Sequence, residues 1–390
     1  MNSVEETRRV EINMGPQHPS THGVGRFILT LNGEIIEDVK PVCGYLHRGL
    51  EKLAENMTYQ QFMPIVDRLD YVASMNNDLA YCLAVEKLLG MEVPERAEYI
   101  RVIVAELGRI ASHLIWLGTM ALDIGALTPF FYTFRDRETI YDMFEEICGA
   151  RLMYNYVRIG GVAKDITPKF MEMLKHFLDT FPRLMKETDG LLTKNRIWMR
   201  RTKDVGVISY DDAINWGLSG PSLRGSGVNW DLRKNRPYGI YPSLEFDVPY
   251  FPEGDVYARY LVRLEEINQS VRILRQCVEK IPAGEYMNPE SPFVRPMKKP
   301  KEGIALKDFV LQIRGVKMPV GEIYFGAENP KGELGFYIVS DGAGKPYRMK
   351  IRTPSFVHVF ALPKIVKGGL VADIVSVISS LDFVFGEVDR

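Results

Sequence analysis

Residues 94–125 read PERAEYIRVIVAELGRIASHLIWLGTMALDIG. Apolar side chains recur in this stretch every three or four residues, which is the spacing of one buried face of an α-helix. The positions are Ile100, Ile103, Val104, Leu107, Ile110, Ala111, Leu114 and Leu117. Pro94 is acceptable in the first turn of such a helix, because the first N–H groups have no partner within the helix. We therefore predict a long core helix here.

Helical patterns continue on both sides of this segment. Pro64 and Pro182 predict breaks or kinks, and Thr167-Pro168 is a typical helix start. The predicted helices cover residues 47–63, 66–90, 134–157, 168–193 and 255–281. The middle of the chain is therefore expected to be helical.

The two ends of the chain carry strand patterns. Residues 26–31 and 34–39 flank Asn32-Gly33, the dipeptide best suited to a tight hairpin turn. Towards the other end we predict strands at 322–325 and 336–339, a turn at Asp341-Gly342 and a helix near 369–379.

These patterns predict an α+β fold with a mainly helical core and small β elements at both ends. We expect an N-terminal β region at 1–43, a helical core at 44–320 and a C-terminal α/β region at 321–390, packed as one compact unit. Within the core, residues 218–254 are loop-rich, and the Pro/Lys-rich stretch 289–302 is expected to be an exposed connector.

The composition excludes several classes of protein. The 390 residues are 46% apolar, and 49 Lys and Arg residues nearly balance 50 Asp and Glu residues. Overall charge therefore favours neither a nucleic acid nor an anionic membrane as partner. The start of the chain has no apolar signal region, and no stretch approaches the roughly 18 apolar residues of a membrane helix. We expect a chain that is neither exported nor membrane-spanning.

The four cysteines, Cys43, Cys82, Cys148 and Cys277, are far apart in the sequence. Because no C-x-x-C pair is present, spacing predicts neither a disulfide framework nor a cysteine-ligated metal site. We expect reduced and mostly buried thiols, as in a cytoplasmic protein.

Two of the six histidines, His18 and His22, lie in the segment GPQHPSTHG at 15–23. Glycine and proline exclude a regular helix here, so the spacing of four residues is weak evidence for a zinc site. A mobile loop with a hydrogen-bonding imidazole is one interpretation, and a structural or exposed histidine is the other.

Two acidic segments are further candidates for a site. In DRLDY at 67–71, helical spacing would place Asp67, Asp70 and Tyr71 along one side, where a tyrosine is ordinarily a core or interface residue. Asp123 lies at the end of the long apolar helix predicted in 94–125. Because its neighbours are apolar, burying this carboxylate without a hydrogen-bonding partner would be costly. We expect a donor beside it, either a protonated histidine or a backbone cap.

Other motifs predict no chemistry of their own. The run HRGLEK at 47–52 is typical of a solvated helix start, and RGSG at 224–227 does not follow a strand as a nucleotide-binding loop does. No Ser or Cys lies in a nucleophile elbow, so no catalytic triad is predicted.

Seven segments in order, spread over nearly the whole chain, carry a resemblance to a known family. They are GPQHPSTHG (15–23), YLHRGLEK (45–52), DRLDY (67–71), ALDIGALTPFF (121–131), LRGSGVNWDLRK (223–234), VSDG (339–342) and DFVFGEVDR (382–390). Together they resemble the 49 kDa subunit family of respiratory complex I, whose fold is similar to that of the nickel-iron hydrogenase large subunit.

The resemblance implies no metal in this chain. Hydrogenase large subunits hold nickel and iron with two C-x-x-C pairs, and the corresponding positions here are residues 70–73 and 384–387, which contain no cysteine. Because those metals require soft thiolate ligands, the chain should carry no such centre. The vacated space would instead receive a quinone head group.

The resemblance also implies the site residues. His22 and Tyr71 match the family's quinone-binding pair, Asp123 matches the acidic partner that orients the histidine, and Val384 would line the same pocket. We take His22, Tyr71 and Asp123 as the catalytic candidates.

Three further positions match residues that the family places beside an iron–sulfur cluster of the neighbouring small subunit. They are Arg48, Arg68 and Met153. Many relatives have a histidine at the last position, so the cluster beside this chain should show a weaker pH dependence.

The function implied is that of a quinone-binding core subunit of a proton-translocating NADH:quinone oxidoreductase. Expected partners are the iron–sulfur small subunit, the 30 kDa-type subunit and a membrane-arm subunit at the quinone entrance, with no nucleic acid. The expected location is peripheral, on the cytoplasmic face of a bacterial cell membrane. The alternatives are a nickel-iron hydrogenase large subunit, disfavoured by the missing cysteine pairs, and a purely structural docking subunit.

Overall fold

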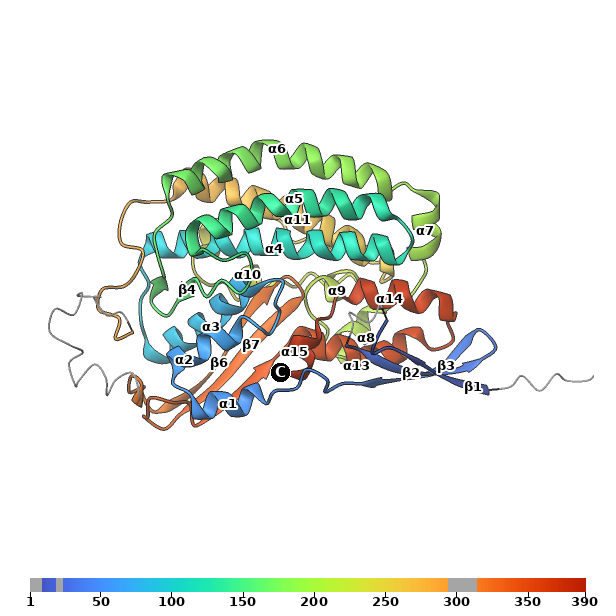
Figure 1. Cartoon of the computed structure of the whole chain (residues 1–390), viewed down its shortest axis with the longest axis horizontal. Coiled ribbons are helices and arrows are strands. Elements are labelled where there is room, and N and C mark those ends of the chain that lie inside the picture. Colours follow the sequence, from blue (N-terminus) through green and yellow to red (C-terminus); the bar gives the residue numbers. More distant parts are fainter. Residues whose placement is uncertain (1–8, 19–23, 294–313) are drawn as a thin grey trace, which may run out of the picture.

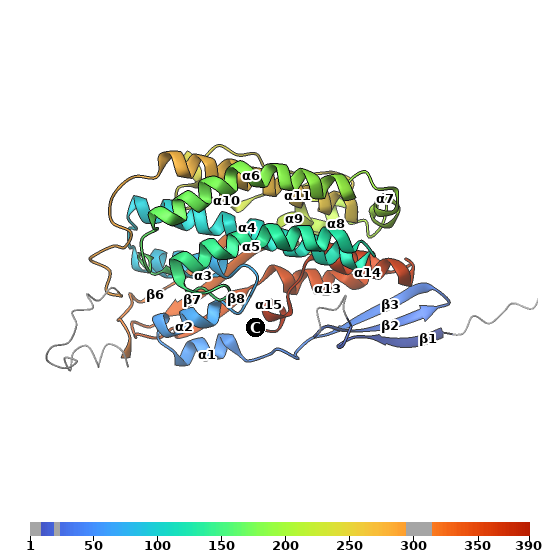
Figure 2. The ribbon, with the colours of Figure 1, turned by 45° about the horizontal axis from the view of Figure 1, so that its top comes forward.

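The computed structural model describes residues 9–18, 24–293 and 314–390. Long helices form one layer, and smaller helices and short sheets lie against it (Figures 1 and 2). The predicted α+β class is therefore confirmed. The long helices are α4 (Glu95–Asp123), α5 (Leu127–Cys148), α6 (Pro168–Leu192) and α11 (Val256–Lys280). Within the described residues, no helix is both long and apolar enough to cross a bilayer.

Helix α4 lies at the centre of this layer and packs against α5 and α11. Its predicted apolar face is buried, with Ile100, Ile103 and Leu107 fully removed from solvent. Helices α4, α6 and α11 agree with the predicted ranges. Pro182 lies inside α6 and does not end it.

The prediction for α5 was wrong at both ends. The helix begins at Leu127 and ends at Cys148, where Gly149 adopts a left-handed conformation with φ of 78°. Met153 and Asn155 also have positive φ values, 55° and 44°, so the chain cannot continue as a helix to 157. A short hairpin follows instead, with β4 at Val157–Arg158 and β5 at Gly161–Val162.

The predicted helix at 47–63 is divided in two. Helix α1 covers Leu50–Asn56 and α2 covers Tyr59–Val66, with Pro64 inside α2. The division occurs at Thr58, whose side chain and that of Gln61 form a reciprocal capping box. Local capping therefore outweighs the continuous helical pattern.

The predicted helix at 66–90 begins later, at Ser74, as α3 (Ser74–Leu89). Residues 67–73 form turns, because Ser74 Oγ donates to the Asp67 carbonyl at 3.0 Å and Asn77 Nδ2 donates to the Asp70 carbonyl at 2.9 Å. Placing Asp67, Asp70 and Tyr71 on one side of a helix was therefore wrong.

Two small antiparallel sheets flank the helical layer. The N-terminal sheet has the order β1-β2-β3, and Asn32-Gly33 makes the predicted turn between the second and third strands. Its strands are β1 (Arg9–Met14), β2 (Arg26–Asn32) and β3 (Ile35–Val42). The second sheet contains the predicted strands in β6 (Gly321–Asn329) and β7 (Gly332–Ser340), together with β8 (Arg348–Arg352), which was not predicted.

The remaining elements are short. The loop-rich prediction for 218–254 agrees with the structure, and residues 294–302 of the predicted connector lie outside the described residues. The helix predicted near 369–379 is the 3-10 turn η3 (Val371–Asp373) followed by α14 (Ile374–Leu381). The other remaining elements are α7 (Arg196–Thr202), α8 (Tyr210–Asn215), α9 (Gly220–Arg224), α10 (Leu232–Asn235), η2 (Tyr241–Ser243), α13 (Pro354–Val366) and α15 (Phe385–Asp389).

Helix α15 packs directly on the turn that follows α2. An added Cβ at Gly386 would lie 2.6 Å from the carbonyl oxygen of Leu69 and 2.8 Å from that of Arg68. Only a residue without a side chain therefore allows this approach. The contact holds the C-terminal helix against residues 67–71.

We predict that Gly386→Ala destabilises the chain by roughly 1–3 kcal/mol, because the methyl group must displace backbone atoms. The thermal unfolding midpoint, followed by near-ultraviolet circular dichroism, measures this change. Gly190→Ala is the matched control, since Gly190 lies in α6 with nothing within 4 Å of an added Cβ. Equal unfolding midpoints for the two variants would contradict the prediction.

Candidate functional site

The candidate site lies where the turn at 67–71 meets the C-terminal end of the chain. The Gly386 contact places residues 384–387 against the carbonyl groups of Arg68 and Leu69, next to residues 70–73. Val384 is buried, and its N–H donates to Ser355 Oγ of α13 at 3.1 Å. Tyr71 is half-buried.

A cluster of buried charges fills the interior behind Tyr71. Lys331, in the turn between β6 and β7, has its Nζ 3.0 Å from Asp70 Oδ2 and 3.7 Å from Asp382 Oδ2. Arg263 of α11 approaches the same Asp382 oxygen at 4.0 Å. We call Asp70, Lys331, Asp382, Glu387 and Arg263 the site cluster. Four separate parts of the chain contribute to it: the turn at 67–71, α11, the turn between β6 and β7, and the C-terminal segment 382–390.

The electrostatics of the site cluster favour a charged lysine. Burial lowers the pKa of Lys331, but Asp382 and Asp70 outweigh burial, so the pKa lies above the usual lysine value. Burial also raises the pKa of Asp382 despite the cations facing it. Lys331 Nζ makes one further contact, with Ser112 Oγ of α4 at 3.1 Å.

Glu387 of α15 is the protonatable member of the cluster. Its Oε2 accepts from Ser355 Oγ at 2.5 Å, and its other oxygen has no hydrogen-bond partner among the described residues. Burial, and then the charge of Asp70, raises the pKa of Glu387 to about 8. The side chain is therefore a neutral carboxylic acid at neutral pH.

Tyr71 faces this cluster as a neutral phenol. Burial raises its pKa, and the neighbouring Asp70 carboxylate raises it further. The hydroxyl therefore keeps its proton at physiological pH and is able to donate a hydrogen bond to a ligand oxygen.

Asp123 is the last residue of α4 and is partly buried. Its Oδ2 accepts a hydrogen bond from Ser379 Oγ of α14 at 2.6 Å. The expectation of a nearby donor is confirmed, but this donor is a serine hydroxyl, which is neither of the two candidates that the sequence suggested. His22, the histidine that the resemblance assigns to Asp123, lies outside the described residues. That pairing stays a prediction.

Arg48, Arg68 and Met153 lie on loops. Arg48 is exposed and follows a loop that the Asp389 carboxylate fixes by accepting from Gly44 N at 2.8 Å and Leu46 N at 2.7 Å. Arg68 is partly buried and donates to the Pro64 carbonyl. Met153 is 37% exposed. Arg48 and Met153 are thus exposed at the surface of this chain, where a partner subunit could contact them.

The sequence did not predict the site cluster. Asp70, Asp382 and Glu387 lie in segments that carried the resemblance, but Arg263 and Lys331 lie in no such segment. A lysine after Asn329-Pro330 reads as a solvated turn residue. Its burial depends on packing that no local pattern reveals.

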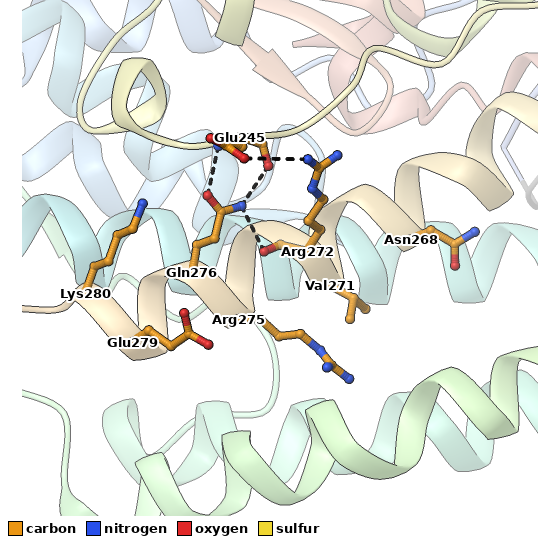
Figure 3. Close-up of a pocket in the computed structure, with 8 residues that line it drawn as sticks. All are labelled: Glu245, Asn268, Val271, Arg272, Arg275, Gln276, Glu279 and Lys280. Atoms are coloured by element: carbon orange, nitrogen blue, oxygen red, sulfur yellow. Dashed lines mark hydrogen bonds and ion pairs between the residues drawn. The ribbon is translucent and has the colours of Figure 1, made fainter.

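A hollow of about 490 Å³ is lined by Glu245 and by side chains of α11, among them Arg272 and Gln276 (Figure 3). Gln276 of α11 accepts from Glu245 N at 2.9 Å and donates to the Glu245 carbonyl at 2.7 Å. Arg272 pairs with Asp247 at 2.9 Å. These contacts fasten the 218–254 segment to α11, so we assign the hollow a structural role.

No group of three or more His, Cys, Asp or Glu side chains within 9–18, 24–293 and 314–390 is arranged to hold a metal ion. The four cysteines are free, with Cys82 and Cys277 buried and Cys43 and Cys148 partly buried.

Comparison with known proteins identifies the family of this chain. The sequence profile described as "Respiratory-chain NADH dehydrogenase, 49 Kd subunit" matches residues 123–390. The chain belongs to this family. A relative from Geotalea uraniireducens, described as a subunit of NADH-quinone oxidoreductase, is 52% identical over 98% of this chain and 99% of its own length. A second relative of the same description, from Methylacidiphilum infernorum, is 53% identical over 99% of this chain and 93% of its own length.

A further relative has a longer chain. This protein, from Aquifex aeolicus, has a name that combines two subunits of NADH-quinone oxidoreductase. It is 52% identical over 97% of this chain, which covers 66% of that relative. The resemblance drawn from the seven sequence segments is thus confirmed as membership of the 49 kDa subunit family.

We predict that Glu387→Gln flattens the pH dependence of stability. Because the folded-state pKa of about 8 exceeds the ordinary value, this carboxyl contributes stability that is complete at acid pH and is lost as the pH rises through about 8. The wild type should therefore lose on the order of a few kcal/mol relative to the variant between about pH 5 and about pH 9.

Denaturant unfolding at a series of pH values measures this difference. The matched control is Glu253→Gln, which changes an exposed carboxylate in the same way. Parallel curves of unfolding free energy against pH for the wild type and Glu387→Gln would show that the carboxyl does not titrate in this range.

Proposed function

We propose that this chain is the quinone-binding core subunit of a proton-translocating NADH:quinone oxidoreductase. The observation that carries the proposal is the identity of 52% over nearly the whole chain with a relative described as a subunit of NADH-quinone oxidoreductase. The chain itself would supply part of the quinone chamber and no redox centre, since the electrons arrive from a partner subunit.

The proposed ligand contact is the Tyr71 hydroxyl, with His22 on the opposite ketone oxygen of the quinone head group. Reduction of a quinone to a quinol takes up two electrons and two protons, so proton donors at the oxygens favour the product. Tyr71 qualifies because burial and Asp70 raise its pKa. Val384, next to the same turn, supports an apolar lining for the ring.

Asp123 is proposed to act through His22, by orienting the imidazole and favouring its protonated form. The Ser379 hydroxyl that bonds Asp123 at 2.6 Å would fix the carboxylate for this purpose. Asp123 is thus a positioning residue, whereas Tyr71 and His22 would touch the quinone.

The hydrogenase alternative is not favoured. Positions 70, 73, 384 and 387 hold Asp, Ala, Val and Glu. The oxygens of Asp70 and Glu387 are hard donors, unlike thiolates, and are already engaged with Lys331 and Ser355. Stoichiometric nickel in the purified assembly would overturn this assignment. A purely structural docking role is tested by the Tyr71 variant below.

The partners follow from the relatives and the surface loops. The Aquifex relative combines two subunits in one chain, which supports contact with a separate 30 kDa-type subunit here. We further propose an iron–sulfur small subunit near Arg48, Arg68 and Met153, where a cation would favour the reduced cluster, and a membrane-arm subunit at the quinone entrance. The assembly would lie on the cytoplasmic face of a bacterial membrane.

Tyr71→Phe should lower quinone reductase activity by at least about 100-fold, the usual contribution of a positioned proton donor. The ring is retained, so packing and assembly should survive. The measurement is the rate per assembled complex, corrected for reduction of the upstream clusters, with several quinones and across pH.

Tyr347→Phe is the matched control, because Tyr347 is 68% exposed and lies outside the site. Its rate should equal that of the wild type. Wild-type rates for Tyr71→Phe with every quinone and at every pH would mean that Tyr71 is only a packing residue and would favour the docking role.

A further inference from the structure

A pair of buried carboxyl groups lies behind the turn that carries Tyr71. Asp67 belongs to this turn and Asp78 to the second turn of α3, and both are 0% exposed. The two carboxyls lie within hydrogen-bonding reach of each other. None of their four oxygens accepts a hydrogen bond of ordinary geometry from another described residue, and no described ion pair includes either group.

Two carboxylates in this position cannot both be ionised. Each would lose its hydration, and the like charges would repel at short range without a cation in contact. One proton between them removes the repulsion and supplies the missing donor. Burial accordingly raises the pKa of Asp67 to about 6 and raises that of Asp78 well above its ordinary value.

The groups around the pair include two cations and three side chains that stay neutral. Arg68 and Arg158 are the cations that act on the pair, and the backbone of Asn155 and Tyr156 faces it from the opposite segment. The other titratable neighbours, Cys82, Cys148 and Tyr154, stay neutral because burial raises their pKa values. The pair is therefore the group that changes charge near neutral pH in this region.

One of the two cations that act on the pair lines a hollow. A hollow of about 620 Å³ lies between α2, the β4–β5 hairpin and residues 285–293, and Arg158 is one of its lining residues. The rest of the lining is largely apolar, with Met63, Ile159 and Val162 among its members. Arg158 therefore lines this hollow and also acts, through its charge, on the buried carboxyls.

The pair is also coupled to the candidate site through the backbone. Asp67 and Tyr71 share one turn, whose carbonyls are held by Ser74 and Asn77 of α3. Asn77 lies beside Asp78 on that helix and in turn accepts from Asn329 of β6 at 2.9 Å. A change of charge between Asp67 and Asp78 would therefore act on the turn that positions the Tyr71 hydroxyl.

We propose that Asp67 and Asp78 form a proton-binding site that holds one shared proton, exchanges it with solvent through the hollow at Arg158, and positions the turn carrying Tyr71. The proton is taken from and returned to water, and no bond other than O–H is made or broken. The part of this proposal that concerns turnover rests on the proposed function.

Infrared spectroscopy of the assembled complex tests the shared proton. At neutral pH the difference spectrum between the wild type and each of Asp67→Asn and Asp78→Asn should contain one carbonyl stretch of protonated carboxylic acid, separate from the stretch of protonated Glu387, which all three proteins retain. Each variant keeps an amide that donates to the remaining carboxylate, which favours folding. The exposed control Asp179→Asn should leave the band unchanged.

A band of wild-type intensity in both variants would overturn the proton site. If one variant fails to assemble, the other still decides, because either substitution removes the same shared proton. Tyr71→Phe should retain the band. Failure of the proposed function would thus appear as a normal Tyr71→Phe rate with the band assignment intact.

The pH profile of quinone reduction tests the positioning role. Both variants should keep their best rate within about threefold of the wild type, under 1 kcal/mol in barrier, while the pH dependence between about pH 5 and about pH 8 flattens. Asp179→Asn should reproduce the wild-type profile. Loss of the infrared band with an unchanged profile would exclude the coupling to Tyr71.

Discussion

Buried ion pairs between α4, α11 and the 218–254 segment fix the elements that carry the candidate site. Arg224 donates to Glu266 of α11 at 3.1 Å and to Glu328 of β6 at 2.8 Å, and Arg233 pairs with Glu106 of α4 at 3.1 Å. All five side chains are essentially inaccessible to solvent. Removing one partner from such a network leaves an uncompensated buried charge and costs about 3–5 kcal/mol, so the relative positions of these elements are tightly restricted.

This network gives RGSG at 224–227 a role that its sequence does not suggest. The sequence predicted no nucleotide-binding loop here. In the structure the side chain of Arg224, the first residue of the motif, is buried and donates to the carboxylates of Glu266 and Glu328. The adjacent Gly225 allows a close approach to α11, because an added Cβ would lie 2.7 Å from Arg259 Cγ. The loop-rich segment is therefore as much a part of the core as the long helices.

Sequence patterns correctly predicted the elements that bury apolar residues at a regular spacing, such as α4 and α11. They failed where a few side-chain hydrogen bonds determine where a helix begins or ends. The turn at 67–73 exists because Ser74 and Asn77 hold its carbonyls, which a helical pattern cannot register. Tyr71 and Val384 could be proposed from resemblance alone. Lys331 could not be proposed, because its local sequence is typical of a surface turn. Its burial depends on the carboxylates of Asp70 and Asp382, which lie far from it in the sequence.

In the site cluster, the carboxylates face cations of the chain itself. A thiolate site is stabilised by the cation that it binds, whereas here the carboxylates of Asp70 and Asp382 face the internal cations Lys331 and Arg263. Glu387 adds no charge at neutral pH, because burial keeps its pKa near 8. In the proposed site a neutral quinone would therefore lie beside residues whose positive and negative charges balance one another. A hydrogen bond donated by the nearby Tyr71 hydroxyl, which keeps its proton, would stabilise the charge that reduction adds to the quinone oxygen.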